Sequence, residues 1–118
     1  MLNKLYYYKA KITSVYDGDT CTADLDLGLH ILSKGEKIRL ARINAPEVRG
    51  ASRQQGLISR DFLRNLILNK EILVQTVKDK KGKYGRYLGE IWLINEDGSL
   101  SNVNDLMVSS GFAEYKEY

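Results

Sequence analysis

The sequence has 118 residues and a mass of 13.4 kDa, with 43% hydrophobic and 28% charged residues. This size and composition are typical of one globular domain and exclude disordered, collagen-like and coiled-coil chains, so we expect a single domain over residues 1–118. The net charge is +3, and Lys78–Arg86 alone holds five basic residues and one acidic residue. This clustering of positive charge favours a polyanionic partner.

Two features of the sequence narrow its location and its chemistry. No apolar run approaches the roughly 20 residues that span a bilayer, and no signal peptide is visible. We therefore expect no membrane partner and a cytoplasmic protein, with secretion still open if a leader has been removed. Cys21 is the only cysteine and His30 the only histidine, which excludes disulfide scaffolds and thiolate zinc sites and disfavours serine triads. Catalysis would have to rest on carboxylates, arginines and a hard cation.

Alternating apolar and polar residues predict five strands along the chain. The predicted strands are 6–16, 23–31, 38–43, 71–77 and 87–94. Turn-forming residues at 33–36 separate the second strand from the third, and Pro46 ends the third in a loop. The basic segment 78–86 is expected to be a solvated loop between the last two strands.

Helical spacing of apolar residues predicts a long helix over 51–68, after the third strand. A short C-terminal helix is expected to begin at a cap formed by Ser101 or Asn102 and to end near Gly111. Five short strands with a helix after the third favour a mainly β (α+β) fold, a closed five-stranded Greek-key barrel of OB type, because closure removes exposed sheet edges. An open α+β sheet is the alternative.

Two acidic tetrapeptides lie where strands meet loops. Asp17–Thr20 has the sequence of a hairpin turn, but its two carboxylates could also face a hard cation. Asn44–Glu47, at the end of the third strand, could add an amide oxygen, a main-chain carbonyl and a second carboxylate. Either tetrapeptide alone is weak evidence for a metal site.

Two arginines accompany these loops. Arg39 lies at an alternating position in the third strand, and Arg86 ends the tetrapeptide Lys83–Arg86. Each could be an ordinary exposed residue or a guanidinium aimed at an anion. Together with the acidic loops they supply what phosphodiester hydrolysis requires: a cation, a carboxylate that activates water, and guanidinium groups for the phosphate.

The chain resembles the staphylococcal nuclease (thermonuclease) family over nearly its full length. The motifs that carry the resemblance, in the family's order, are Asp17–Thr20, Ile38–Leu40, Asn44–Glu47, Lys83–Arg86 and Ser110–Ala113. The resemblance implies an OB-fold barrel and a nuclease that uses one calcium ion and hydrolyses DNA and RNA with little sequence selectivity. It further implies 3′-phosphate products, a preference for single strands and action as a monomer.

By motif position, the resemblance implies roles for individual residues. Asp19 would bind calcium through its carboxylate, Asn44 through its amide oxygen and Ala45 through its main-chain carbonyl. A secreted nuclease of the family has aspartate where this chain has Asn44. A neutral ligand in place of an anionic one should weaken calcium binding.

The remaining implied roles concern the substrate. Glu47 would orient or deprotonate the attacking water, and Arg39 and Arg86 would bind the scissile phosphate. Lys83 and Tyr84 would contact a neighbouring phosphate.

Two other kinds of function stay open at this point. The barrel could be a catalytically weak or inactive nucleic-acid-binding module, although the presence of Arg39, Glu47 and Arg86 argues against this. It could also be a structural or interaction protein, which would leave the basic segment unexplained. Tyr115 and Tyr118 either stack on bases or belong to a frayed end.

Overall fold

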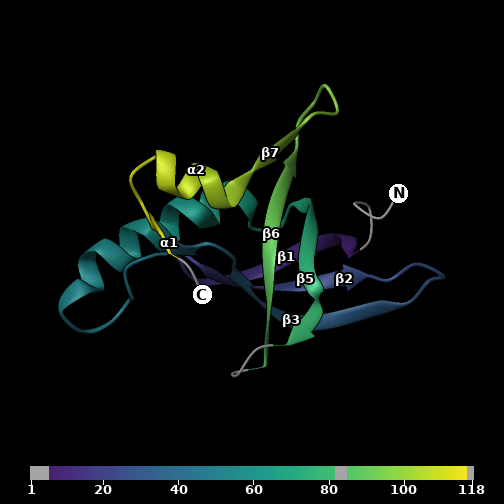
Figure 1. Ribbon diagram of the computed structural model, residues 1–118, viewed down its shortest axis with the longest axis horizontal. Helices are drawn as coiled ribbons and strands as arrows, with labels where there is room; N and C mark the ends of the chain where they lie inside the picture. The colour runs from purple at the N-terminus through teal and green to yellow at the C-terminus, as the bar shows by residue number, and fades with distance from the viewer. Residues whose placement is uncertain (1–5, 82–84, 117–118) are drawn as a thin grey trace.

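The computed structural model describes residues 6–81 and 85–116. The elements in chain order are β1 (Tyr7–Asp17), β2 (Thr20–Asp26), β3 (Leu32–Leu40), β4 (Ile43–Asn44), a 3₁₀ turn (Gly50–Ser52), α1 (Arg53–Ile67), β5 (Glu71–Lys81), β6 (Arg86–Ile94), β7 (Leu100–Asn102), α2 (Val103–Ser109) and β8 (Glu114–Tyr115). Figure 1 shows that the long strands surround a common interior and that the helices lie to one side of them.

Five strands close on themselves. β1 pairs antiparallel with β2 and with β5, β2 pairs with β3, and β5 pairs with β6. The ring is closed by β3 and β6, which run parallel, with Lys37 opposite Arg86 and Leu40 opposite Gly89. This confirms the predicted mainly β, closed OB-type barrel, with the long helix after the third long strand and the short helix near the C-terminus.

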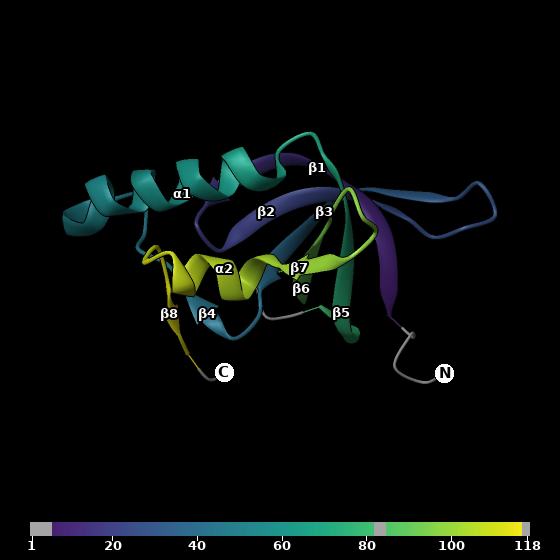
Figure 2. The ribbon, with the colours of Figure 1, turned by 90° about the horizontal axis from the view of Figure 1, so that it is seen from above.

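The barrel interior is filled by branched apolar side chains because alternate residues of each strand point inward. Ile12, Ile38 and Ile91, from three different strands, are completely buried. The helices add Leu63 from α1 and Met107 from α2 to the same core. Both helices lie toward one end of the molecule, whereas the β2–β3 hairpin extends toward the other (Figure 2).

The turn between β2 and β3 differs from the prediction. The chain reverses at Gly28–His30, where all three residues have positive φ, and the expected turn at 33–36 lies inside β3. Asp26 accepts a hydrogen bond from the Gly28 amide at 2.8 Å, which favours a turn there. The apolar alternation through 27–31 was misleading because Leu29 projects from the hairpin tip and is 90% exposed.

The predicted helices are confirmed, and the basic segment is more regular than expected. α1 spans Arg53–Ile67, and the side chain of Asn102 caps α2 by accepting the Asp105 amide at 2.8 Å. β5 continues to Lys81, so much of the predicted basic loop is strand. In the part of the chain that the structure describes, neither helix has the length and apolar character needed to cross a membrane.

Candidate functional site

The turn between β1 and β2 holds the first candidate ligand in a fixed position. The Asp19 amide donates to the Asp17 carboxylate at 3.1 Å, which forms a local side-chain turn. Gly18 is buried beneath it, and a Cβ at this position would lie 2.7 Å from the Ala45 Cβ and 2.8 Å from the Ser59 Cβ. Glycine is therefore required for close packing, and the tetrapeptide is both a tight turn and part of a buried site.

Arg39 joins this turn to the segment that follows β3. Its Nη1 donates to the carbonyls of Leu40 and Ile43 at 2.7 and 3.0 Å. Its Nη2 lies 3.3 Å from the Asp19 Oδ2 and donates to the Asn44 Oδ1, also at 3.3 Å. The guanidinium is thus held by main-chain carbonyls on one nitrogen and directed at both candidate ligands with the other.

Asp19 is 5% exposed and has several hydrogen-bond donors around it. Its Oδ1 accepts the Thr20 hydroxyl at 3.0 Å, and its Oδ2 accepts the Ala45 amide at 2.8 Å. The latter bond brings the Ala45 main chain directly to the carboxylate. The role expected of Ala45 involves its carbonyl oxygen, and that role stays a prediction.

A single pocket of about 240 Å³ collects most of the predicted site residues. Its lining includes Asp19, Arg39, Asn44, Ala45, Glu47 and Arg86. The loop after β4 brings Glu47 to this pocket, and the first residue of β6 brings Arg86, because β6 pairs in parallel with β3. Lys83 and Tyr84 lie outside the described residues.

The two carboxylates of the turn strongly influence each other. Burial raises the pKa of Asp17 to about 6, and the hydrogen bond and negative charge of Asp19 contribute in the same direction. Burial and the neighbouring negative charge therefore disfavour the charged form of the Asp17 carboxylate, and a nearby cation would offset them. The pocket therefore has an electrostatic character that favours a positive group.

The donor set of the pocket suits a hard cation. One atom, the Nη2 of Arg39, lies at 3.3 Å from both the Asp19 and the Asn44 oxygens, so these two oxygens converge. Within the described residues, no three side chains of the His, Cys, Asp and Glu types are grouped as a metal site. Amide, carbonyl and water oxygens would have to complete the coordination, a ligand set that calcium accepts.

The position of Glu47 depends on a contact that the sequence did not reveal. The main chain of Glu47 lies against Gly56 of α1, where a Cβ would collide with the Glu47 carbonyl and would lie 2.8 Å from the Val48 nitrogen. The Ser52 hydroxyl also donates to the Glu47 carbonyl at 3.1 Å. A glycine inside an amphipathic helix is the one sequence signal that indicates such an approach.

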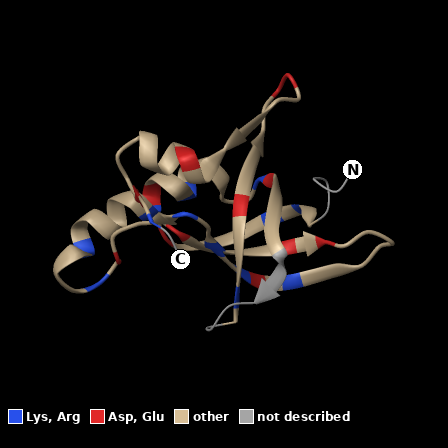
Figure 3. Cartoon of the chain, viewed as in Figure 1, with Lys and Arg blue, Asp and Glu red and all other residues tan. Residues whose placement is uncertain are grey.

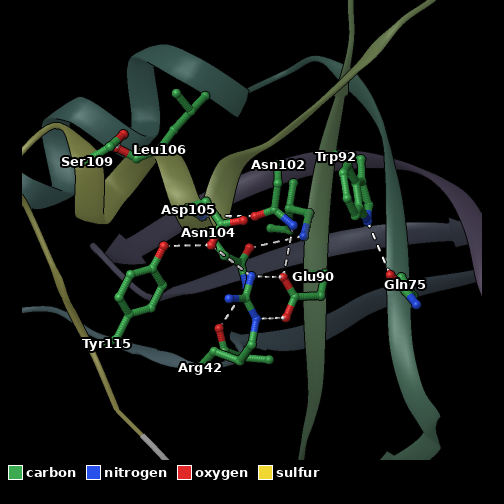
Figure 4. Close-up of polar contacts among 12 residues, drawn as sticks. Arg42, Gln75, Glu90, Trp92, Asn102, Asn104, Asp105, Leu106, Ser109 and Tyr115 are labelled. Atoms are coloured by element: carbon green, nitrogen blue, oxygen red, sulfur yellow. Dashed lines mark hydrogen bonds and ion pairs between the residues drawn. The ribbon is translucent and has the colours of Figure 1, made fainter.

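A second missed feature is a polar cluster behind β4, shown in Figure 4. Arg42 donates through Nε and Nη2 to the two carboxylate oxygens of Glu90, at 2.8 and 2.7 Å, and Nη2 also lies 3.0 Å from the Asp105 Oδ1. The Tyr115 hydroxyl donates to the same Asp105 oxygen at 2.9 Å, and this bond raises the pKa of Tyr115. Tyr115 is therefore part of an ordered arrangement rather than a frayed end.

This cluster holds the strand that carries Asn44. β8 pairs antiparallel with β4, with Tyr115 opposite Ile43 and Glu114 opposite Asn44. Figure 2 shows β4 and β8 side by side near α2. The candidate ligand is thus fixed on one side by Arg39 and on the other by the C-terminal part of the described chain.

Comparisons with known proteins identify the family to which the sequence is similar. The family model described as "Staphylococcal nuclease homologue" matches residues 37–118. Thermonucleases of Staphylococcus hyicus and Staphylococcus intermedius are each 27% identical to the chain, over 92% and 91% of its length. An uncharacterized protein of Methanocaldococcus jannaschii is also 27% identical, over 91% of the chain. The chain spans 58–59% of the length of these relatives.

Proposed function

We propose that this chain, which belongs to the staphylococcal nuclease family, is a calcium-dependent nuclease that hydrolyses DNA and RNA with little sequence selectivity. It would act as a monomer, favour single strands and leave 3′-phosphate ends. The observation that carries the proposal is the convergence of Asp19, Arg39, Asn44, Glu47 and Arg86 on one pocket of about 240 Å³. The two staphylococcal relatives, both thermonucleases, support the same activity.

The arginines would bind the scissile phosphate. Arg39 is prepared for this role because two main-chain carbonyls hold its Nη1, so little side-chain freedom remains to be lost on binding. Arg86 approaches the same pocket from the neighbouring strand. Guanidinium groups match the oxygens of a phosphate and would stabilise the negative charge that develops on it.

Glu47 would be the general base. Its side chain is exposed at the pocket, where water can reach it, and its main chain is held by the contact with α1. It would take the proton of the attacking water while the 5′-oxygen leaves. Asp19, Asn44 and Ala45 would hold calcium, which when bound supplies further positive charge next to the phosphate.

The test is degradation of single-stranded DNA in calcium, in magnesium and in chelator, comparing wild type with Glu47→Gln at equal concentrations of folded protein. Loss of a general base lowers the rate by about 10²- to 10⁴-fold. We expect calcium-dependent cleavage by wild type and a loss of this size in the variant. Glu96→Gln, an exposed change in the β6–β7 turn, is the matched control and should cleave at the wild-type rate.

Two outcomes would contradict the proposal. Equal cleavage by wild type and Glu47→Gln would remove Glu47 from the reaction. Salt-sensitive binding of DNA without cleavage in any metal would identify a nucleic-acid-binding module instead. The neutral Asn44 among the candidate ligands is the observation that favours this second function.

A further inference from the structure

A groove of about 840 Å³ continues from the candidate pocket across the outer surface of the barrel. The groove and the pocket share Tyr16, Thr20, Glu47, Arg49 and Arg86. The groove then extends over Ser14, Thr22 and Lys37. None of the roles assigned above uses this extension.

The groove has a regular structural basis. Ser14 lies opposite Thr22, Thr22 opposite Lys37, and Lys37 opposite Arg86, so these four residues form one row across β1, β2, β3 and β6. Directly paired residues project from the same face of a sheet. The row is therefore on the outer face, because Ile38, the neighbour of Lys37, points into the core.

The row is close to the proposed phosphate site. Lys37 and Arg39 are two residues apart on β3 and project from the same face, about 7 Å apart along the strand. This spacing is of the order that separates consecutive phosphates of a nucleic acid strand. Basic residues lie on both β3 and β6, the two parallel strands (Figure 3).

The charge of the groove is positive. Its lining contains Lys37, Arg49 and Arg86 but only one acidic residue, Glu47. In the part of the chain that the structure describes, neither Lys37 nor Arg49 forms an ion pair, and both are exposed. Their charges are therefore available to an anionic ligand.

Tyr16 gives the groove an aromatic surface. Between Val15 and Asp17 the β1–β2 register shifts: two steps along β1 correspond to one step along β2, so Tyr16 is the extra residue of a bulge. Such bulges redirect side chains and are frequent beside active sites. Val15 and Asp17 are buried, whereas Tyr16 is 56% exposed at the groove.

We propose that this groove binds the nucleotide next to the scissile phosphate, with its base stacked on Tyr16 and its phosphate held by Lys37 and Arg49. Strands β1 and β3 lie about 10 Å apart with β2 between them, and Tyr16 is two residues along β1 from Ser14, which shares a row with Lys37. Stacking on an exposed ring requires an unpaired base, so the groove selects single strands. The inference rests on the proposed nuclease function and adds a second subsite to it.

The test measures binding of fluorescent oligothymidylate of eight residues to protein carrying Glu47→Gln, which prevents cleavage. Adding Tyr16→Ala should weaken binding about 5- to 150-fold, the equivalent of 1–3 kcal/mol per stacked base, whereas Tyr16→Phe should keep it. Adding Lys37→Ala should reduce the slope of log affinity against log salt by about 0.7. Lys9→Ala, an exposed change elsewhere on β1, should alter neither quantity.

The outcomes separate this inference from the function on which it rests. If the parent protein binds the oligonucleotide and Tyr16→Ala and Lys37→Ala bind it equally well with unchanged salt slopes, the groove is not a subsite and the proposed nuclease stands. If the wild type cleaves no DNA and the parent binds none, the proposed function fails and the subsite fails with it. Tyr16→Ala should reduce the affinity for the single strand much more than the affinity for a duplex of the same length, because the bases of the duplex are paired.

Discussion

At the scale of single residues, the proposed role of Asn44 as a calcium ligand can be tested by changing its charge. Its Oδ1 and the Asp19 Oδ2 each lie 3.3 Å from the Nη2 of Arg39. Asn44→Asp adds a negative charge with almost no change in volume. We expect calcium affinity to rise on the order of tenfold, because the number of charged ligands is a main determinant of calcium binding. Titration calorimetry with calcium at constant ionic strength measures this.

The control for this prediction adds the same charge away from the pocket. Asn65→Asp lies on the exposed face of α1 and changes the net charge equally. Its calcium affinity should equal that of the wild type. Equal affinity for Asn44→Asp and Asn65→Asp would show that Asn44 is not a ligand.

At the scale of elements, the packing of α1 against the Glu47 loop should link stability to the proposed activity. Alanine is normally better than glycine inside a helix by about 1 kcal/mol. At Gly56 alanine should instead be less stable than glycine, because a Cβ there would collide with the Glu47 carbonyl. We expect Gly56→Ala to lower the free energy of unfolding, measured in urea, and to lower kcat/KM by up to about 10²-fold through displacement of Glu47.

Gln54→Ala, an exposed change two residues before Gly56 on the same helix, is the matched control. It should change neither the unfolding free energy nor kcat/KM appreciably. An increase in stability on Gly56→Ala with full activity would mean that the helix can move away from the loop without displacing Glu47.

The helices, turns and site residues show which parts of the fold and of the site can be predicted from the sequence. Helical spacing and the cap at Asn102 are local properties, so α1 and α2 were predicted correctly. Motif order was enough to select residues that share one pocket. The turn at 28–30 was missed because period-two alternation continues through it. The contact of Gly56 with Glu47 and the bulge at Tyr16 depend on tertiary packing and strand register, and the glycine within the helical pattern is the one local sign of the contact.

At the scale of the whole molecule, Asn104 ties the second helix to the barrel. It is completely buried, accepts the Ile91 amide at 3.1 Å and donates to the carbonyls of Ala41 and Gly89 at 2.9 and 3.1 Å. Asn104→Ala would remove this partner from the Ile91 amide and the Ala41 carbonyl, whereas the Gly89 carbonyl would still accept the Ala41 amide at 2.8 Å. We expect the free energy of unfolding to fall by about 2–5 kcal/mol, since each such group costs about 1–3 kcal/mol.

The rate at which the Cys21 thiol is labelled can measure this loss of stability. It is the only cysteine, is 1% exposed in the core, and has a pKa raised to about 12 by burial and then by the charge of Asp17. Only a thiolate reacts with a disulfide reagent, so at pH 8 labelling should occur through molecules that have opened. We expect Asn104→Ala to label about 30- to 5,000-fold faster than wild type, in proportion to the larger open population.

The pH dependence of stability gives an independent check on the same thiol. The unfolded thiol ionises near its ordinary pKa of 9.0, whereas the folded thiol keeps its proton to about 12. The folded state therefore binds the proton more tightly, and the contribution of Cys21 to stability should fall as pH rises from about 9 to 12.

The control for the labelling experiment is Asn65→Ala, an exposed asparagine change, which should label at the wild-type rate. If Cys21 in Asn104→Ala labels at the wild-type rate, the barrel opens without breaking the bonds of Asn104. In that case α2 does not contribute to the stability of the barrel.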